Sequence, residues 1–238
     1  MRLISLILLF LLSGTVSAQK VEWYTTTQTS PWVKQKVKPE RVTTGAEIVL
    51  DPTLRLQLIM GIGGCFNEMG WDALNALSAE DREAVLQAIF SKDGACFNYC
   101  RLPMGANDFA LSFYSSADVA GDFNLVNFNI DRDRYILIPY IKAARQINPD
   151  LRIWASPWCP PAWMKTNNHY ASAVRPSGEK DVNGLLPREA ITEFSTGFRM
   201  EEGYLKTYAD YFARFIKAYE AEGLPLECIH VQNEPCSN

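Results

Sequence analysis

From about residue 58 onward, short apolar segments alternate with longer amphipathic ones, and this alternation constrains the fold more than any other feature of the sequence. Apolar runs of strand length that are separated by helical patterns are typical of βα units on a parallel sheet, with helices covering the faces of the sheet. We therefore predict an α/β fold for this part of the chain. The predicted strands are residues 58–66, 96–102, 151–155 and 226–231.

Helix signals lie between these predicted strands. Ser78 can cap a helix in which Asp81 occupies the capping-box position. A second helix is predicted to begin near Asp131, and the longest to run from about Glu201 to Glu222 before Gly223. The apolar stripes of these two helices are Tyr135, Ile138, Ile141 and Ala144 in the former and Tyr204, Tyr208, Tyr211, Phe212 and Phe215 in the latter.

The first 18 residues have the three parts of a secretory signal peptide. Arg2 is the positive region, Leu3–Leu12 is an apolar run too short to span a bilayer comfortably, and Val16–Ala18 is a small-residue cleavage site. We expect a secreted protein, extracellular or periplasmic, without a membrane span. Residues 19–58 are rich in Thr, Val and Trp with Pro and Gly breaks, which predicts a β-rich segment of short strands joined by turns.

Charge and glycine spacing exclude two classes of ligand. With 23 basic and 27 acidic residues, the chain has a formal net charge of −4, which is unsuited to tracking nucleic-acid phosphates. The glycines of the segment Gly61–Gly64 lack the spacing of a phosphate-binding loop and favour a tight turn beneath a ligand. We expect no cofactor.

The cysteines give no metal signature. No paired CxxC occurs, and only His169 and His230 could add imidazole ligands, so we expect no zinc site. Secretion would permit disulfides, but buried thiols that pack like small apolar residues are the favoured interpretation. Cys96 and Cys100 cannot bridge each other while their predicted strand stands, because about 13 Å would separate them. The six cysteines are Cys65, Cys96, Cys100, Cys159, Cys228 and Cys236.

Polar and aromatic residues gather after the predicted strands, where two connections are unusually long. Arg101 and Asp108 lie at the rim of the second strand, Trp158 follows the third on a proline-braced loop, and Glu234 follows the fourth. Loops of this length are usually functional. A carboxyl group at such a rim can be partly desolvated, which raises its pKa and lets it act as a general acid. Aromatic faces beside carboxylates and amides suit a sugar.

Taken together, the segments that follow the four predicted strands resemble glycoside hydrolase family 30, the glucosylceramidase-like retaining β-glycosidases on a (β/α)8 TIM barrel. The likeness extends from about Gly61 to Pro235. It implies a β-glucoside, a glycolipid or a β-glucan as substrate. It also implies that the N-terminal segment lends strands to a separate β-sandwich.

The resemblance assigns roles to five residues. Glu234 would be the general acid/base, and Asn233 would contact the 2-hydroxyl of the sugar. Asp108 and Trp158 would line the glycone subsite, while Arg101 would orient carboxylates near the strand ends.

The second carboxylate of a retaining enzyme is absent from this set. Retaining hydrolysis needs a nucleophile, which in the family follows the seventh strand, and no residue of this sequence matches that motif. The four predicted strands are spaced about 56 residues apart on average, so eight would need about 450 residues. We therefore expect residues 59–238 to form an incomplete domain, the N-terminal half of the barrel, inactive alone and partnered by the missing C-terminal half.

Two other hypotheses stay open. One is a non-catalytic carbohydrate-binding or subunit-forming module. The other is an inverting enzyme with Asp108 or Glu68 as base, in which the two carboxyl groups would lie about 6.5–9.5 Å apart. Glu68 is either a contact of the substrate or of its binding residues, or an exposed loop carboxylate. Trp163 is interpreted as packing beneath its loop, and His230 as a barrel residue rather than a catalyst.

Overall fold

The chain forms two units in the computed structural model, Met1–Leu56 and Gln57–Asn238. The predicted signal peptide, residues 1–18, and Cys236 lie outside the described residues, as does part of the predicted β-rich segment. The structure describes residues 21–38, 45, 49, 51, 53–174, 183–191 and 195–235.

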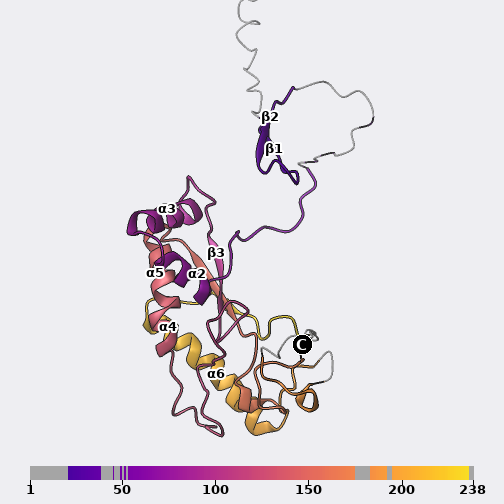
Figure 1. The fold of residues 1–238 in the computed structure, drawn as a ribbon, viewed down its shortest axis with the longest axis vertical. Helices are drawn as coiled ribbons and strands as arrows, with labels where there is room; N and C mark the ends of the chain where they lie inside the picture. Colours follow the sequence, from indigo (N-terminus) through magenta and orange to yellow (C-terminus); the bar gives the residue numbers. More distant parts are fainter. Residues whose placement is uncertain are drawn as a thin grey trace, which may run out of the picture. The chain divides into compact units, whose positions relative to one another are not determined.

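The first unit contains an antiparallel pair of strands, β1 (Trp23–Thr25) and β2 (Val33–Gln35) (Figure 1). A lone two-stranded pair is marginally stable in water. Here the ring of Tyr24 stacks on that of Trp32, with centroids 5.3 Å apart, and the Lys34 ammonium lies 5.6 Å from the Tyr24 ring. These contacts stabilise the hairpin.

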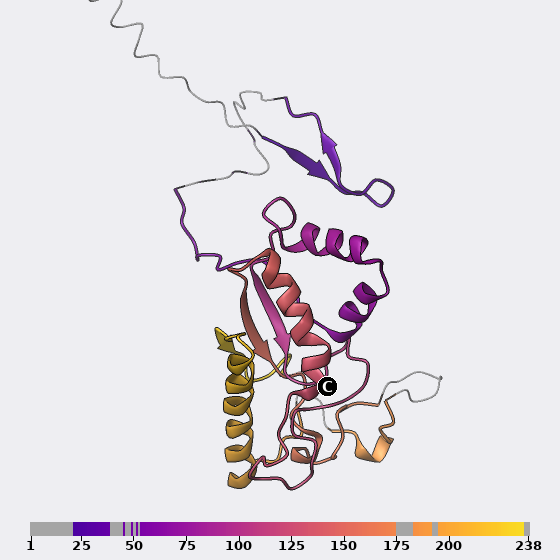
Figure 2. The ribbon, with the colours of Figure 1, turned by 90° about the vertical axis from the view of Figure 1, so that its left-hand side faces the viewer.

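The second unit is built on a parallel sheet of β3 (Tyr99–Pro103), β4 (Arg152–Ser156) and β5 (Cys228–Ile229), in that order. The three strands lie within or beside the ranges predicted for them. Figure 2 shows β3 and β4 side by side, both directed toward the end where the long connections lie. Parallel pairing of this kind agrees with the predicted α/β class.

The prediction of a regular strand at residues 58–66 is wrong. The segment is extended along β3 and pairs with it through one bridge, Cys65 with Arg101, and through hydrogen bonds such as that from the Arg101 amide to the Gly64 carbonyl. Gly63 explains the irregularity, because a Cβ there would lie 2.3 Å from the Tyr99 carbonyl oxygen. Gly63 therefore serves a close approach between backbones rather than a turn beneath a ligand.

The helices of this unit fall largely where the periodicity predicts. Ser78 caps α3 as predicted, its hydroxyl accepting from the Asp81 amide at 3.0 Å. Asn67 caps α2 in the same way, although this helix was not predicted. The described helices of the unit are α2 (Glu68–Asn75), α3 (Ala79–Phe90), α4 (Asp131–Tyr135), α5 (Leu137–Ile147), α6 (Glu202–Ala221) and two single 3₁₀ turns, Ala162–Met164 and Pro187–Glu189.

The single helix predicted from Asp131 is divided in two at Ile136. Pro139 accounts for the break, because its ring would clash with the carbonyl of Tyr135 in a continuous helix. Tyr135 consequently points outward with 80% of its surface exposed, so its predicted place in the core is wrong. Ile138, Ile141 and Ala144 are buried as predicted.

The two faces of the sheet have different surroundings. Cys100, Leu102, Ile153 and Ala155 belong to the buried core on one face, and α2, α3 and α5 lie on one side of the sheet in Figures 1 and 2. Tyr211, Phe215 and Tyr219 of α6 are buried in the same core, while Tyr204 and Tyr208 are half-buried.

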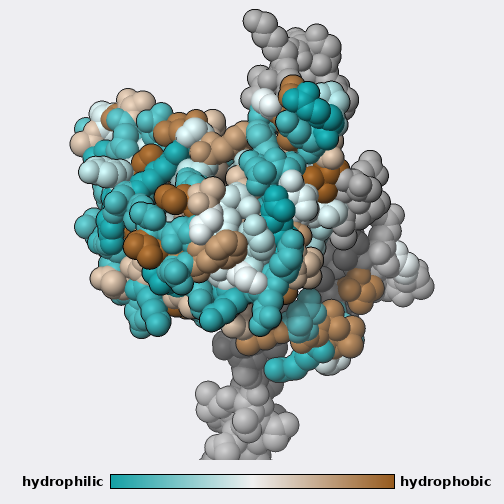
Figure 3. Space-filling view, turned by 90° about the horizontal axis from the view of Figure 1, so that it is seen from below, coloured by the Kyte–Doolittle hydropathy of each residue, from teal (hydrophilic) through white to brown (hydrophobic). Residues whose placement is uncertain are grey.

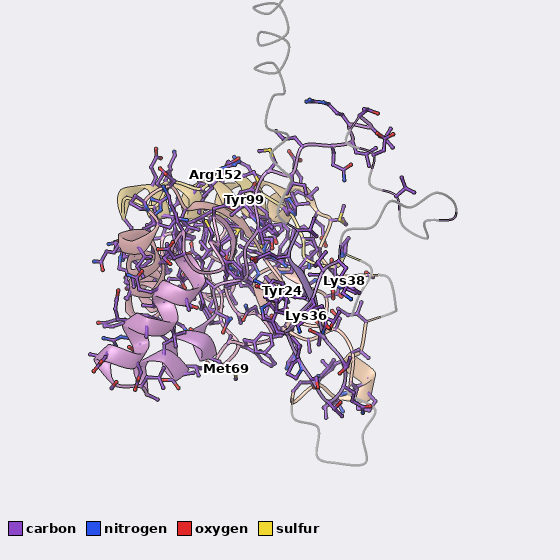
Figure 4. The ribbon with its side chains drawn as sticks, turned by 90° about the horizontal axis from the view of Figure 1, so that it is seen from above. Tyr24, Lys36, Lys38, Met69, Tyr99 and Arg152 are labelled. Carbon is purple, nitrogen blue, oxygen red and sulfur yellow. The ribbon has the colours of Figure 1, made fainter. Side chains whose placement is uncertain are left out.

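The opposite face carries a row of cations on aromatic rings. The Arg152 guanidinium lies 4.7 Å from the ring of Tyr99, its partner in register, and both are labelled in Figure 4. Further along the same face, the Arg101 guanidinium lies 5.0 Å from the Trp154 ring. This face leads to the carboxyl ends of the strands.

The described cysteines are free thiols. Cys100 and Cys159 are buried, Cys65 and Cys96 are half-buried, and Cys228 is exposed. Burial raises the pKa of Cys65 and of Cys159 to about 11, so neither thiol ionises readily at neutral pH. Among the described residues, none of the helices combines the length and the hydropathy needed to cross a bilayer.

Candidate active site

A cavity of about 750 Å³ opens at the carboxyl ends of the parallel strands. Its volume falls within the range of small-molecule sites. Asp108, Trp158, Asn233 and Glu234, which follow three different strands, all line it. Figure 3 views the molecule from this end and shows hydrophilic and apolar side chains interspersed over the surface. Residues predicted from scattered motifs thus meet at one place.

Arg101 connects these groups from the end of β3. Its Nε donates to the Ser156 hydroxyl at 2.9 Å, and its Nη2 donates to Asn233 Oδ1 at 2.7 Å. The guanidinium also lies 3.8 Å from the centroid of the Trp158 ring. Burial lowers the pKa of Arg101, and the negative charges of Glu234 and Asp108 act in the opposite direction. Arg101 therefore fixes Asn233 and Trp158 and places a positive charge near both carboxylates.

The tail after β5 is held mainly through its backbone and its amides. The backbone N–H of Asn233 donates to the Pro157 carbonyl at 2.8 Å, and the side-chain Nε2 of Gln232 donates to the Trp158 carbonyl at 2.8 Å. Glu234 has a positive φ of 41° and an exposed side chain at the rim of the cavity. The expected desolvation of this carboxyl is not observed, because its side chain is exposed.

Asp108 is presented by a turn that sequence reasoning missed. The neighbouring Asn107 is buried, and its Oδ1 accepts from the Phe109 amide at 3.0 Å. This hydrogen bond spans Asp108 and holds its exposed carboxylate at the cavity wall. An Asn that precedes a polar residue is an ordinary turn signal, and it was available in the sequence.

Glu68 is not an exposed loop carboxylate, and it does not line the cavity. It is 2% exposed at the start of α2, where Arg132 Nε donates to it at 2.6 Å and the Leu111 amide donates at 2.7 Å. Its oxygens are occupied by internal donors, which removes the motive for assigning it as the base of an inverting enzyme.

Trp163 is buried where it was predicted, whereas His230 is exposed. Trp163 packs beneath the loop as predicted, with its indole N–H donating to the Ala117 carbonyl at 2.8 Å. His230 is exposed and lies against Trp154, with ring centroids 4.4 Å apart.

Lys165 is a further cavity residue that no motif predicted. It is 2% exposed, and its Nζ donates to the Tyr170 carbonyl at 2.7 Å and to the Ser172 hydroxyl at 3.0 Å. Burial lowers the pKa of Lys165, and the nearby Cys159 acts in the opposite direction. Its bonds tie together the loop after β4. Within the described ranges, no group of three His, Cys, Asp or Glu side chains is placed to hold a metal ion.

Comparison with known proteins agrees with this geometry. The model of the glycosyl hydrolase family 30 TIM-barrel domain matches residues 59–184, more than half of the chain. The chain belongs to glycosyl hydrolase family 30. The predicted family and the α/β TIM-barrel class are thereby confirmed.

The proteins that this chain is similar to include glucosylceramidases and an endo-beta1,6-glucanase. A putative glucosylceramidase 4 of Caenorhabditis elegans is 30% identical over 93% of this chain and 40% of its own length. The lysosomal acid glucosylceramidase of Mus musculus is 29% identical over 84% of this chain and 35% of its own. The solved structure of the endo-beta1,6-glucanase BT3312 superposes with a TM-score of 0.60 at 28% identity, covering 78% of this chain and 37% of that one. The chain thus spans about two fifths or less of these relatives.

Proposed function

We propose that this chain carries the acid/base half of the active site of a secreted retaining β-glycosidase. The observation that carries the proposal is the meeting of Arg101, Asp108, Trp158, Asn233 and Glu234 at one cavity beyond the ends of parallel strands. Catalytic groups of TIM-barrel enzymes occupy this end of the strands.

Each residue has a chemical task in the proposal. Glu234, exposed at the rim, protonates the leaving oxygen and later activates water. Asn233, fixed by Arg101, hydrogen-bonds the hydroxyl next to the anomeric carbon, and Asp108 binds hydroxyls further around the ring. The Arg101 guanidinium lies over the ring of Trp158, and the indole is thereby presented to the sugar.

The substrate we propose is a β-glucoside, either a glucosylceramide-like glycolipid or a β-glucan. The support is the names of the relatives, which are glucosylceramidases and an endo-beta1,6-glucanase. We propose that the nucleophile and the remaining barrel strands come from a part that corresponds to the uncovered length of the relatives, and that the N-terminal hairpin belongs to a β-sandwich. Without the nucleophile we expect the 238 residues alone to be inactive.

The experiment separates the acid role of Glu234 from a structural one. In an active form that supplies the second carboxylate, Glu234→Gln is compared with wild type on an alkyl β-glucoside and on dinitrophenyl β-glucoside. The alkoxide is a poor leaving group that needs a proton, whereas dinitrophenolate leaves without one. We expect a loss of about a thousandfold or more in turnover of the alkyl glucoside and a much smaller loss in bond cleavage of the dinitrophenyl compound. An equal loss on both would refute the acid assignment.

The alternative, a non-catalytic carbohydrate-binding module, is favoured by the same aromatic rim. This alternative predicts that a form that supplies the second carboxylate binds β-glucosides without turnover. It also predicts that Glu234→Gln leaves the affinity for these glucosides unchanged.

A further inference from the structure

The cavity has an aromatic wall to which the proposed chemistry gives no task. Phe113 and Tyr170 come from the two long connections, after β3 and after β4, and their rings stack with centroids 4.4 Å apart and planes 11° apart. Tyr170 is fixed by a 2.8 Å hydrogen bond from its hydroxyl to the Ala106 carbonyl. Phe113 is 51% exposed. An exposed ring held against a fixed one presents its remaining surface to the cavity.

This wall belongs to two cavities at once. Phe113 and Tyr170 line the large cavity and also an adjoining one of about 240 Å³. A ligand longer than one sugar can therefore extend from Trp158 and Asp108 past this wall. We propose that Phe113 is a stacking platform for a second sugar residue of a β-linked oligosaccharide. The proposal rests on the proposed function, because it needs a saccharide in the large cavity.

The smaller cavity has the polar groups that a sugar requires. Ser115, Asp118, Asn168 and His169 line it beside the aromatic wall. The Nδ1 of His169 accepts from the Ala171 amide at 3.0 Å, so Nε2 carries the proton of the neutral ring and can donate to a hydroxyl. An apolar ring face with hydroxyl partners at its edge suits a sugar better than an acyl chain.

Hydrogen bonds hold the chain on both sides of Phe113 in place. The Leu111 amide donates to Glu68 Oε2 at 2.7 Å, and Arg132 Nη1 donates to the Ser112 hydroxyl at 2.8 Å. On the other side of Phe113, the Tyr114 hydroxyl donates to buried Asp133 at 2.9 Å. The residues on both sides of Phe113 are thus held by hydrogen bonds. A binding surface held in this way loses little conformational entropy when a ligand binds.

The experiment measures affinity as a function of ligand length. The 238-residue chain is titrated by ligand-observed NMR with glucose, a β-1,6-linked glucose tetrasaccharide and octyl β-glucoside. For Phe113→Ala we expect tetrasaccharide affinity to fall about three- to tenfold and glucose affinity to fall less than twofold. Phe113→Trp should restore the tetrasaccharide affinity. Tyr135→Ala is the matched control, because Tyr135 is an exposed aromatic residue that lines neither cavity.

The outcomes separate the two proposals. Equal loss of affinity for glucose and tetrasaccharide, or no loss for either, overturns the platform while leaving the proposed function in place. A loss confined to octyl glucoside also overturns it and assigns Phe113 to an alkyl chain. If the unsubstituted chain binds none of the ligands, or if Trp158→Ala does not weaken glucose binding, the proposed glycone site itself fails.

Discussion

The segment after β3 and the tail after β5 both reach the cavity, yet they are held by different means. The segment from Leu111 to Tyr114 is fastened by an anchor network of buried or half-buried side chains, Glu68, Arg132, Tyr114, Asp133 and Tyr219. The tail from Val231 to Pro235 carries the exposed Glu234 and is held by hydrogen bonds from the Asn233 backbone and the Gln232 side chain to carbonyls of the loop after β4. Charges of the first region are satisfied internally, whereas the carboxylate of the second faces the cavity.

This difference separates a carboxylate that holds the fold, Glu68, from one that acts on the substrate in the proposed function, Glu234. Glu68 has no oxygen to spare for a ligand, because Arg132 and the Leu111 amide occupy both. The negative charge of Glu234 acts to raise the pKa of Arg101, yet the Glu234 side chain stays exposed to solvent. Substitutions in the anchor network should therefore cost stability, and substitutions in the tail should cost function.

Glu68→Gln should show the largest effect on stability. It removes the charge opposite Arg132, whose side chain is 30% exposed, and breaking a buried pair from one side is strongly destabilising. We expect a loss of about 3 kcal/mol in the free energy of unfolding, measured by urea denaturation. Glu80→Gln, on the exposed surface of α3, is the control and should change little. A loss below about 1 kcal/mol would mean that the pair does not anchor the segment.

Asp133 should make stability depend on pH. Burial raises its pKa to about 6, although hydrogen bonds from the Tyr219 and Tyr114 hydroxyls oppose the shift. In the unfolded chain an Asp titrates near 3.9. Between about pH 4 and 6 the folded protein keeps a proton that the unfolded chain has lost, so its stability falls as pH rises and then levels off. The total change from this group is about 2 to 3 kcal/mol.

The measurement for Asp133 is the free energy of unfolding as a function of pH. Asp133→Asn should remove this part of the slope between pH 4 and 6, while Asp131→Asn, exposed on the same helix, should keep it. Parallel slopes for wild type and Asp133→Asn would contradict the assignment.

Arg101→Lys should have an intermediate effect on stability. Lysine keeps the charge but loses the planar group that stacks on Trp158 and the fork that reaches Ser156 and Asn233. We expect a loss of about 1 kcal/mol, together with weaker glucoside binding, from denaturation and titration of the same sample. Wild-type binding in this variant would show that Asn233 and Trp158 need no such support.

Glu234→Gln should have the smallest effect on stability. The side chain is exposed, so we expect a change within about 0.5 kcal/mol in urea denaturation. The comparison between the two regions would break down if Glu234→Gln destabilised the protein as much as Glu68→Gln.

Local signals predicted much of this structure. The Ser78 cap, the extent of α6 and the burial of Ile138 and Ile141 follow from residues close together in sequence. The candidate site residues were named from the family resemblance, and the structure brings them together because each lies at or beyond the end of a parallel strand, where carboxyl ends meet at one edge. Pro139 carried the signal for the helix break that was missed, since proline constrains the preceding turn.

Other features depend on partners far apart in sequence. Glu68 and Arg132 are 64 residues apart, and no spacing rule joins them. The stacking of Phe113 on Tyr170 likewise depends on how two long loops meet. The shortness of β5, which spans Cys228–Ile229, was likewise not indicated by the apolar run at 226–231.

The register of the sheet also bears on how the chain folds. Tyr99 pairs with Arg152, and Trp154 pairs with Cys228, so every ladder contact between these strands closes a loop of more than about fifty residues. Contacts of such long range slow folding, because the entropy of closing the loop is lost before the pairing is gained. The cavity lies beyond these strand ends, and we expect it to take shape only in the last steps of folding.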